Sequence, residues 1–376
     1  MMSIIIGADI VPTESNQLYF DSGKMLSIVG EGLLSFLKNA DFRIFNLECP
    51  LVDQESPIQK SGPTLRAKTS SVNGLKALGV DLLSLANNHI MDHGFDGLKS
   101  TIDILTNSKI SFVGAGKNLF EAAHAKFFEL NQKKMAVYAC AEHEFSIAKP
   151  KEPGANPFDM LESFDSIFNL KKNCDYLIVL YHGGKEYYRY PSPMLQRICR
   201  KFIERGADLV VCQHSHCIGC EEKYMDGTIV YGQGNFIFDL HKSLITQSSL
   251  LIKIEDDFKI EYFPIEKNGF GIRLAEAEIR EKILFDFYQR SELIKDVEFV
   301  EKEYMKFAKK MLNDYLLTCS GYNHKLWQKI LNRLSGRRLY NFFGKKTYSS
   351  KDLLAIRNFI ECEAHRELFI EGLRDR

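Results

Sequence analysis

Short apolar runs alternate with helical patterns along the first part of the chain, up to about residue 215. The strand-like runs are 3–9, 42–48, 81–87, 134–140, 175–182 and 207–214. Apolar residues recur at helical spacing between several of them, over 25–39, 70–78, 94–107 and 192–205. Because strands that alternate with helices form sheets covered by helices, this order predicts an α/β fold.

The pattern changes after residue 215. Two stretches, 221–232 and 248–265, are typical of hairpins of antiparallel strands. From about residue 276 to the end, the chain is rich in Glu, Lys, Arg and Leu at helical spacing. We therefore predict two domains, with residues 1–272 forming the α/β part and residues 273–376 forming a helical C-terminal region.

The charge balance and the short apolar runs exclude several classes of protein. The chain has 49 basic and 49 acidic residues, so its formal net charge is zero, which argues against a nucleic-acid partner. The apolar runs are far shorter than the ~20 residues of a membrane-spanning helix, and the N-terminus lacks a basic leader region. The nine cysteines are best explained as reduced thiols. We predict a cytoplasmic protein without a transmembrane segment.

Residues 333–346, within the helical region, stand out by their charge. They include five basic residues, three aromatic residues and no acidic residue. A solvated loop between helices is the favoured interpretation, because charge runs usually face water. A peripheral contact with a membrane surface or a polyanion is the alternative.

Polar residues follow the predicted strands at the points where the strands end. They are Asp9, Glu48, Asn88, His182 and His214, and His216 lies two residues beyond the last of them. Open α/β sheets bind their ligands at the carboxyl ends of strands, so we expect these side chains to meet. Carboxylate, amide and imidazole groups together can hold one or two divalent ions, with Mn, Fe, Zn and Mg as the candidates.

Each of these residues also has an ordinary structural explanation. Asp9 after a strand is a common turn former, and His182 is also compatible with a buried, hydrogen-bonded histidine. The Cys217–Cys220 pair after His216 has no second such pair in the sequence, so separate thiols are favoured over a zinc or redox site. Six polar residues at successive strand ends are poorly explained by separate accidents, and we interpret them together as a metal site.

Six motifs in a fixed order then make a family resemblance specific. They are GADIVPT, FNLECPL, LANNHIMDHG, LYHGGKEYYRYPSPMLQ, GADLVVCQHSH and YGQGNFIFD, spread over residues 7–239. Over about residues 1–270 the chain resembles the CapA (poly-γ-glutamate capsule synthesis) family of the calcineurin-like metallophosphoesterase superfamily. The resemblance implies a metallophosphoesterase-like four-layer αββα sandwich, with the C-terminal helical region outside it.

The resemblance also implies which residues bind the metals. Asp9 and His216 would bind a first ion, Glu48 would bridge two ions, and a second ion would take the ligands Asn88, His182 and His214. The wider superfamily usually has D-x-H at the first motif, where this chain has Val11, and an aspartate where this chain has Glu48. These departures leave one ion and two ions both open.

Catalytic and substrate residues are implied in the same way. His89 would donate a proton to the leaving oxygen, Asp92 would orient its imidazole, and water activated by the metal would be the nucleophile. Substrate contacts would come from Arg66, Asn87, Glu186 and Asn235.

The resemblance implies a metal-dependent phosphoesterase-type hydrolase that acts in capsule or cell-envelope polymer synthesis. Its substrate would be a phosphorylated small molecule or a polymer precursor. One alternative is a nucleotide or sugar-phosphate phosphodiesterase without a capsule role. Another is a non-catalytic, metal-binding accessory protein of a polymer-synthesis complex. The intact His89 argues against the accessory protein, because a structural metal site does not need a proton donor.

Overall fold

The computed structural model describes residues 3–240, 243–320, 334 and 347–374. It divides into two compact units, Met1–Glu301 and Lys302–Arg376. These units are defined by compactness, and the predicted domains 1–272 and 273–376 stay a prediction. The basic segment 333–346 lies outside the described residues apart from Leu334, so the prediction of a peripheral membrane contact is not tested.

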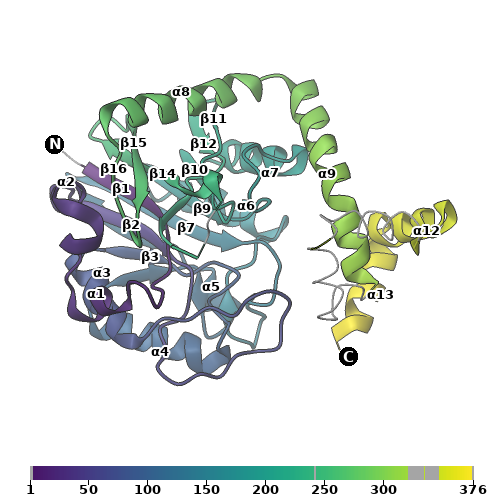
Figure 1. Ribbon diagram of the computed structural model, residues 1–376, viewed down its shortest axis with the longest axis horizontal. Coiled ribbons are helices and arrows are strands. Elements are labelled where there is room, and N and C mark those ends of the chain that lie inside the picture. Colours follow the sequence, from purple (N-terminus) through teal and green to yellow (C-terminus); the bar gives the residue numbers. More distant parts are fainter. Residues whose placement is uncertain (1–2, 241–242, 321–333, 335–346, 375–376) are drawn as a thin grey trace. The chain divides into compact units, whose positions relative to one another are not determined.

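The first unit contains two large sheets, and the first of them has eight strands (Figure 1). Their order is β16-β15-β14-β1-β2-β3-β4, with β13 paired to β1. The bounds are β1 Ser3–Ile10, β2 Phe42–Leu47, β3 Leu82–Ser84, β4 Ser111–Val113, β13 Asn235–Ile237, β14 Ser248–Glu255, β15 Ile260–Asn268 and β16 Gly271–Leu274. Strands β1 to β4 and β13 are parallel, so their carboxyl ends share one edge. Asp9 is level with Asn46 on one neighbouring strand and with Asn235 on the other.

The second sheet has six strands in the order β11-β12-β10-β9-β7-β6. The bounds are β6 Lys126–Leu130, β7 Lys133–Ala141, β9 Tyr176–His182, β10 Leu209–Gln213, β11 Glu221–Tyr224 and β12 Gly227–Val230, and a separate small pair is formed by β5 Ala115–Gly116 and β8 Gly154–Ala155. Strands β7, β9 and β10 are parallel, and the register aligns Ala141, His182 and Gln213. The carboxyl ends of this sheet are therefore also gathered at one edge.

Helices cover the outer faces of both sheets. On the first sheet lie α1 Gln17–Ser22, α2 Leu26–Lys38, α3 Val72–Ala77 and α4 Gly94–Asn107, and on the second lie α6 Glu162–Lys171 and α7 Pro193–Glu204. The remaining short helices are α5 Leu119–Ala122, η1 Thr69–Ser71 and η2 Leu244–Thr246. α8 Ala277–Leu293 packs against β15 and β11. The layers thus follow the order helix, sheet, sheet, helix.

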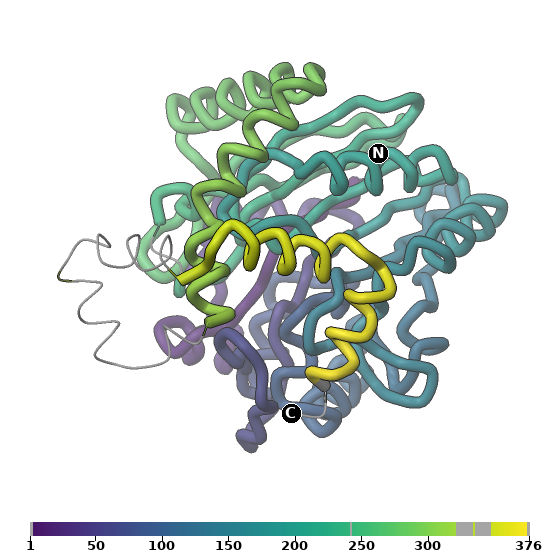
Figure 2. The backbone as a smooth tube through the Cα atoms, turned by 90° about the vertical axis from the view of Figure 1, so that its right-hand side faces the viewer, coloured from purple at the N-terminus to yellow at the C-terminus, as the bar shows by residue number. Residues whose placement is uncertain are grey.

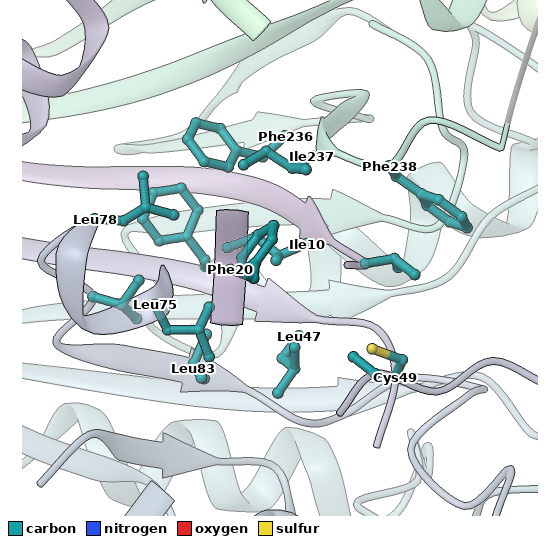
Figure 3. Packing of buried hydrophobic residues seen from close by; sticks show 14 of the residues in the cluster. Ile10, Phe20, Leu47, Cys49, Leu75, Leu78, Leu83, Phe236, Ile237 and Phe238 are labelled. Atoms are coloured by element: carbon teal, nitrogen blue, oxygen red, sulfur yellow. The ribbon is translucent and has the colours of Figure 1, made fainter. Parts of the chain in front are cut away.

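The alternation of side chains along each strand explains this layering. In β1, Ile5 packs into the core beneath the helices, whereas Ile4 and Ile6 pack into the core between the two sheets. Figure 3 shows other residues of the core beneath the helices, among them Phe20 and Leu75. In β9, Val179 faces α7 and Ile178 faces the first sheet. Strands buried on both faces are apolar throughout, which is why the sequence shows continuous apolar runs. The predicted four-layer αββα sandwich is confirmed.

The C-terminal helical region is confirmed where the structure describes it. It contains α9 Val297–Cys319, α12 Ser350–Glu361 and α13 Glu363–Arg374. α12 begins with a capping box between Ser349 and Asp352, and α12 and α13 contact one another (yellow in Figure 2). No helix among the described residues is long and apolar enough to cross a membrane.

Candidate metal centre

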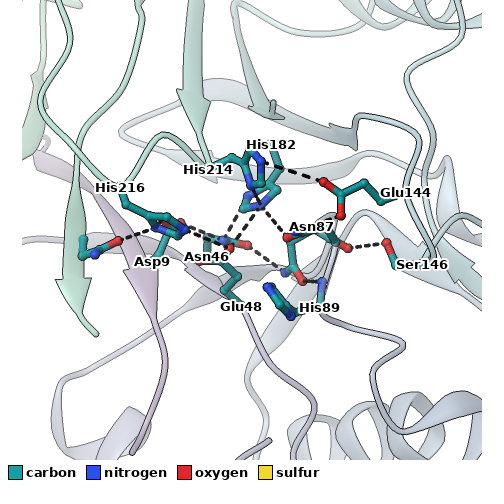
Figure 4. Close-up of polar contacts among 12 residues, drawn as sticks. Asp9, Asn46, Glu48, Asn87, His89, Glu144, Ser146, His182, His214 and His216 are labelled. Atoms are coloured by element: carbon teal, nitrogen blue, oxygen red, sulfur yellow. Dashed lines mark hydrogen bonds and ion pairs between the residues drawn. The ribbon is translucent and has the colours of Figure 1, made fainter. Parts of the chain in front are cut away.

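The six predicted metal ligands converge at the carboxyl ends of the two sheets. From the first sheet come Asp9 at the end of β1, Glu48 after β2 and Asn88 after β3, and from the second come His182 at the end of β9 and His214 and His216 after β10. All six are buried, and none is more than 7% exposed. Figure 4 shows the labelled carboxylate and imidazole groups pointing toward one another. The structure brings the six side chains together, and their role as ligands stays a prediction.

One side of the cluster is formed around His216. Its Nδ1 lies 3.5 Å from Asp9 Oδ2, and its Nε2 lies 4.0 Å from Glu48 Oε1. Asn235 Oδ1 lies 2.8 Å from His216 Nδ1. Val11, which stands where the wider superfamily has a histidine, has a buried apolar side chain and offers no ligand atom.

The other side of the cluster is formed around His182. Its Nε2 lies 3.3 Å from Glu48 Oε1, 3.1 Å from Asn88 Oδ1 and 3.2 Å from His214 Nδ1. Glu48 therefore faces both sides of the cluster. This is the position that a carboxylate shared by two ions would need.

Buried carboxylate oxygens that accept no hydrogen bond within the described residues make the cluster a fit for a cation. Within the described part of the chain, Asp9 Oδ2 and both carboxylate oxygens of Glu48 are buried and accept no hydrogen bond. Leaving buried carboxylate oxygens without hydrogen bonds is costly, and an ion bound between them would remove the cost. Ligand atoms of Glu48, His214 and His216 all lie within 4.8 Å of one another. Carboxylate and imidazole donors suit Zn²⁺, Mn²⁺ and Fe²⁺.

The surroundings of the cluster shift the pKa values of His216 and His214 in opposite directions. Burial alone would raise the pKa of Asp9, but its contacts with His216 and His182 outweigh burial and lower that pKa. Burial alone would lower the pKa of His216, but the carboxylates of Glu48 and Asp9 raise it to about 9. The pKa of His214 lies well below its ordinary value, because burial and the neighbouring imidazoles both disfavour its charged form.

The loop that carries His214 and His216 has a strained backbone. His214 has φ 89° and His216 has φ 53°, a region that residues other than glycine rarely adopt. The loop also packs closely on Gly232, where an added Cβ would lie 2.5 Å from Ser215 Oγ. Strain of this kind persists where the surrounding structure holds a functional loop in place.

A histidine–carboxylate pair lies beside the cluster, and the catalytic roles predicted for its members, His89 and Asp92, stay predictions. His89 Nδ1 lies 2.6 Å from Asp92 Oδ2, so the imidazole donates to the carboxylate at Nδ1. Asp92 also accepts a hydrogen bond from Leu65 N at 2.6 Å, and it forms an ion pair with Lys60 Nζ at 2.6 Å. The side chains of Lys60 and Asp92 are only 2% and 1% exposed. This network fixes the orientation of the His89 ring.

The predicted substrate residues are placed in different ways. Asn87 donates to Asn46 Oδ1 and Leu47 O, and Asn235 contacts the cluster at His216. Arg66 pairs with Glu55 and lines an open groove of about 1010 Å³. Glu186 is half-buried on the loop after β9, and no contact within the described residues joins its side chain to the six ligands. Their roles toward a substrate stay predictions.

Three polar residues of the site were missed by the sequence analysis. Asn46 donates to Asp9 Oδ1 at 2.8 Å, and its Nδ2 lies 3.4 Å from His182 Nδ1. Glu144 accepts from Asn88 Nδ2 at 3.2 Å, and Lys60 holds Asp92. Asn46 lies in β2, two residues before Glu48, which directly follows that strand, and this period of two was a usable signal. Lys60 and Glu144 lie on loops, where no periodic pattern indicates them.

A four-layer sandwich with a histidine–carboxylate cluster at the carboxyl ends of both sheets defines the class of metallophosphoesterase-like proteins. The family model of the bacterial capsule synthesis protein PGA_cap matches residues 11–240. The chain therefore belongs to this capsule-synthesis family, and the predicted resemblance to that family is confirmed.

Curated relatives agree with this assignment. The capsule biosynthesis protein CapA of Bacillus anthracis is 33% identical over 213 residues, covering 54% of this chain and 52% of that protein. The PGA biosynthesis protein CapA of Bacillus subtilis strain 168 is 29% identical over 236 residues, covering 62% and 60%. The chain thus spans only about half to three fifths of the length of these relatives.

The chain also matches solved structures at low sequence identity. A phosphatase from Mycoplasma pneumoniae matches with a TM-score of 0.43 and 16% identity, covering 71% of this chain and 94% of that one. A 5′-nucleotidase precursor from Thermus thermophilus matches with a TM-score of 0.41 and 14% identity, covering 77% and 58%.

Proposed function

We propose that the chain is a metal-dependent phosphoester hydrolase acting in the synthesis of a capsule or cell-envelope polymer. The observation that carries the proposal is that buried carboxylate oxygens of Asp9 and Glu48 accept no hydrogen bond in the described structure and face the imidazoles of His182 and His216. The capsule role is supported by family membership alone. Fold and family do not fix a reaction, so the chemistry is argued from the site.

The cluster would hold divalent ions in two positions. Asp9 and His216 would bind one ion, and Asn88, His182 and His214 would bind the other, with Glu48 between them. When bound, such ions supply a nucleophile at neutral pH by lowering the pKa of water, and they neutralise charge on a phosphoryl group.

The side chains around the cluster supply the acid chemistry. His89 Nδ1–H donates a hydrogen bond to Asp92 Oδ2, so Nε2 points away from this pair. A protonated Nε2 would donate to the leaving oxygen of a phosphoester. Asp92, held by Lys60 and Leu65, acts as the positioning residue of His89.

The size of the groove that Arg66 lines is an argument for a substrate larger than phosphate itself. It is bounded by residues 11–15 and 64–68, and its volume of about 1010 Å³ is large for a small-molecule site. Leu65 lines this groove and also donates its backbone N–H to Asp92. Leu65 thus lies between the groove and Asp92, and the groove would take the remainder of a phosphorylated polymer precursor.

The test is a metal analysis combined with a phosphoester assay on the full chain. We expect the purified protein to bind Mn²⁺, Fe²⁺ or Zn²⁺ and to hydrolyse a generic phosphate mono- or diester. His89→Ala should lower kcat by about 10²–10⁴-fold while metal content stays unchanged. His124→Ala is the matched control, because His124 is exposed and bonds only locally to Phe120 O at 2.7 Å.

Three results would contradict the proposal. They are the absence of bound metal after loading, the absence of hydrolysis with metal bound, and full activity of His89→Ala. Metal binding without any hydrolysis would favour the non-catalytic accessory protein. Hydrolysis of nucleotides or sugar phosphates without an effect on polymer synthesis in cells would favour the phosphodiesterase.

A further inference from the structure

Two acidic residues, Glu142 and Glu144, follow β7 on a loop that reaches the candidate metal centre from the second sheet. Glu142 is anchored to the backbone, since its Oε1 accepts from Gly184 N at 3.1 Å. Glu144 reaches further, and its Oε2 accepts from Asn88 Nδ2 at 3.2 Å. Figure 4 shows Glu144 at the edge of the cluster, directed toward it.

We propose that Glu144 is the positioning residue of Asn88 and thereby controls the affinity of the metal position formed by Asn88, His182 and His214. This inference rests on the proposed function, because it assumes that the cluster binds metal. It concerns a residue outside the six ligands, and none of the sequence motifs includes it.

The geometry of the Asn88 amide carries the proposal. An amide has an oxygen that can bind a metal and a nitrogen that cannot, and a half-turn of the group exchanges them. A carboxylate only accepts hydrogen bonds, so Glu144 selects the orientation in which Nδ2 faces it. In that orientation Asn88 Oδ1 faces His182 Nε2 at 3.1 Å, inside the cluster.

The backbone around Asn88 is already fixed on both sides. Ser146 Oγ, on the same loop as Glu144, donates to Asn87 O at 2.7 Å, and Lys60 Nζ donates to Asn88 O at 3.2 Å. Ser146 is 1% exposed, so this loop is docked firmly on the segment that carries Asn88. Rotation of the Asn88 side-chain amide is then the remaining freedom, and the hydrogen bond to Glu144 prevents that rotation.

A second contact of Glu144, with His214, also supports a positioning role. Glu144 Oε1 lies 3.9 Å from His214 Nε2, while His214 Nδ1 faces His182 on the opposite side of the ring. Carboxylates placed behind metal-binding imidazoles and amides orient them, and losing such a partner typically lowers metal affinity 10–100-fold. The side chain of Glu144 is 38% exposed, so replacing it leaves the core intact.

The experiment is a calorimetric titration of the metal-free full chain with Mn²⁺ and with Zn²⁺. We expect Glu144→Ala to weaken the affected position by about 10–100-fold. Glu144→Gln keeps an acceptor for Asn88 Nδ2 and should weaken it less. Glu152→Ala is the matched control, because Glu152 lies on the same segment, is exposed and pairs with Lys149.

A double-mutant cycle separates positioning from a direct or purely electrostatic role. In an Asn88→Ala background, Glu144→Ala should change metal affinity by less than about threefold, because the amide it orients is gone. An equal loss in both backgrounds, or an equal loss for Glu144→Gln and Glu144→Ala, would overturn the proposal. An unchanged affinity of Glu144→Ala would overturn it as well.

The failure of this inference differs from the failure of the proposed function. If the unmodified chain binds no metal, the proposed function fails, and the inference falls with it. If the unmodified chain binds metal and Glu144→Ala binds it equally well, only the inference fails. Metal affinity is the readout in each case, so the result does not depend on finding the substrate.

Discussion

The two sheets contribute different chemistry to the candidate metal centre. Of the six predicted ligands, the first sheet supplies those that bind through oxygen, Asp9, Glu48 and Asn88, and the second supplies only imidazoles, His182, His214 and His216. Both carboxylates come from the first sheet, so the negative charge of the six ligands lies on one side. Neither sheet holds a complete ligand set, and the site exists only when the sheets pack face to face.

This division couples metal binding to folding. The core between the sheets brings the two ligand sets into contact, and packing it leaves the Glu48 carboxylate buried without hydrogen bonds in the described structure. A bound ion would stabilise the packed state, because a ligand that binds only the folded form shifts the folding equilibrium. The predictions below test this division between an oxygen half and an imidazole half.

Loss of Glu48 should have the largest effect, because it is the predicted ligand that faces both His182 and His216. Glu48→Gln keeps the size of the side chain and removes its charge, and we expect metal affinity to fall at least about a hundredfold, or ~2.7 kcal/mol. His216→Ala should affect one metal position and leave the other measurable. Calorimetric titration with Mn²⁺ and elemental analysis check both expectations, with Glu162→Gln, an exposed charge change, as the control.

The division between an oxygen half and an imidazole half would be contradicted if the two substitutions had the reverse effects on metal binding. A Glu48→Gln chain that keeps all of its metal while His216→Ala loses all of it would place the binding energy in the imidazoles alone. The carboxylates of the first sheet would then have a structural role, and the coupling between the sheets would need another cause.

Asn46 joins the two halves directly, and its loss should be the next largest effect. Its Nδ2 donates to Asp9 Oδ1 at 2.8 Å and lies 3.4 Å from His182 Nδ1, and its Oδ1 accepts from Asn87. Asn46→Ala leaves buried polar atoms without partners, and we expect the free energy of unfolding to fall by about 2 kcal/mol. Urea denaturation of the metal-free protein measures this change.

Asn73→Ala is the control for that measurement, because Asn73 is exposed and bonds to Asp21 O on the surface. It should destabilise the protein less than Asn46→Ala does. Equal effects of the two substitutions would show that the bridge between the sheets adds no stability.

The strand ends explain how much of this site could be predicted from the sequence. Asp9, Glu48 and His182 stand directly at or after apolar runs, so the period of the strands and the rule for α/β sheets were enough to group them. The layering was predictable for a related reason, since continuous apolar runs indicate strands buried on both faces. The short edge strands β4 and β6 were missed, because three to five partly exposed residues carry little periodic signal.

The supporting residues were not predictable in this way. Lys60 and Glu144 lie on loops, and their positions depend on how distant segments pack, as in the contact between Glu144 and Asn88. The positive φ of His214 and His216 is likewise set by the fold, since the local sequence does not call for it. Sequence patterns therefore predict which elements bring ligands together, and tertiary packing decides which residues hold them.

The smallest expected effect is the release of a proton on metal binding, which should distinguish His216 from His214 within the imidazole half. Burial alone would lower the pKa of His216, but Glu48 and Asp9 raise it to about 9 in the metal-free protein, above its ordinary value of 6.5. The stabilisation from this charge is fully present below pH 6.5 and is lost as the pH rises through 9. At pH 7 a metal ion must displace the proton of His216, whereas His214, with its pKa well below the ordinary value, has no proton to release.

We therefore expect metal binding at pH 7 to release about one proton for this pair of histidines, and the apparent affinity to rise about tenfold, ~1.4 kcal/mol, between pH 7 and pH 8. Titrations in buffers with different ionisation enthalpies measure the released proton directly. His216→Ala should abolish the buffer dependence. A binding enthalpy that is the same in every buffer would mean that His216 is neutral before the metal arrives, and the carboxylates of the first sheet would then not control the charge of the second.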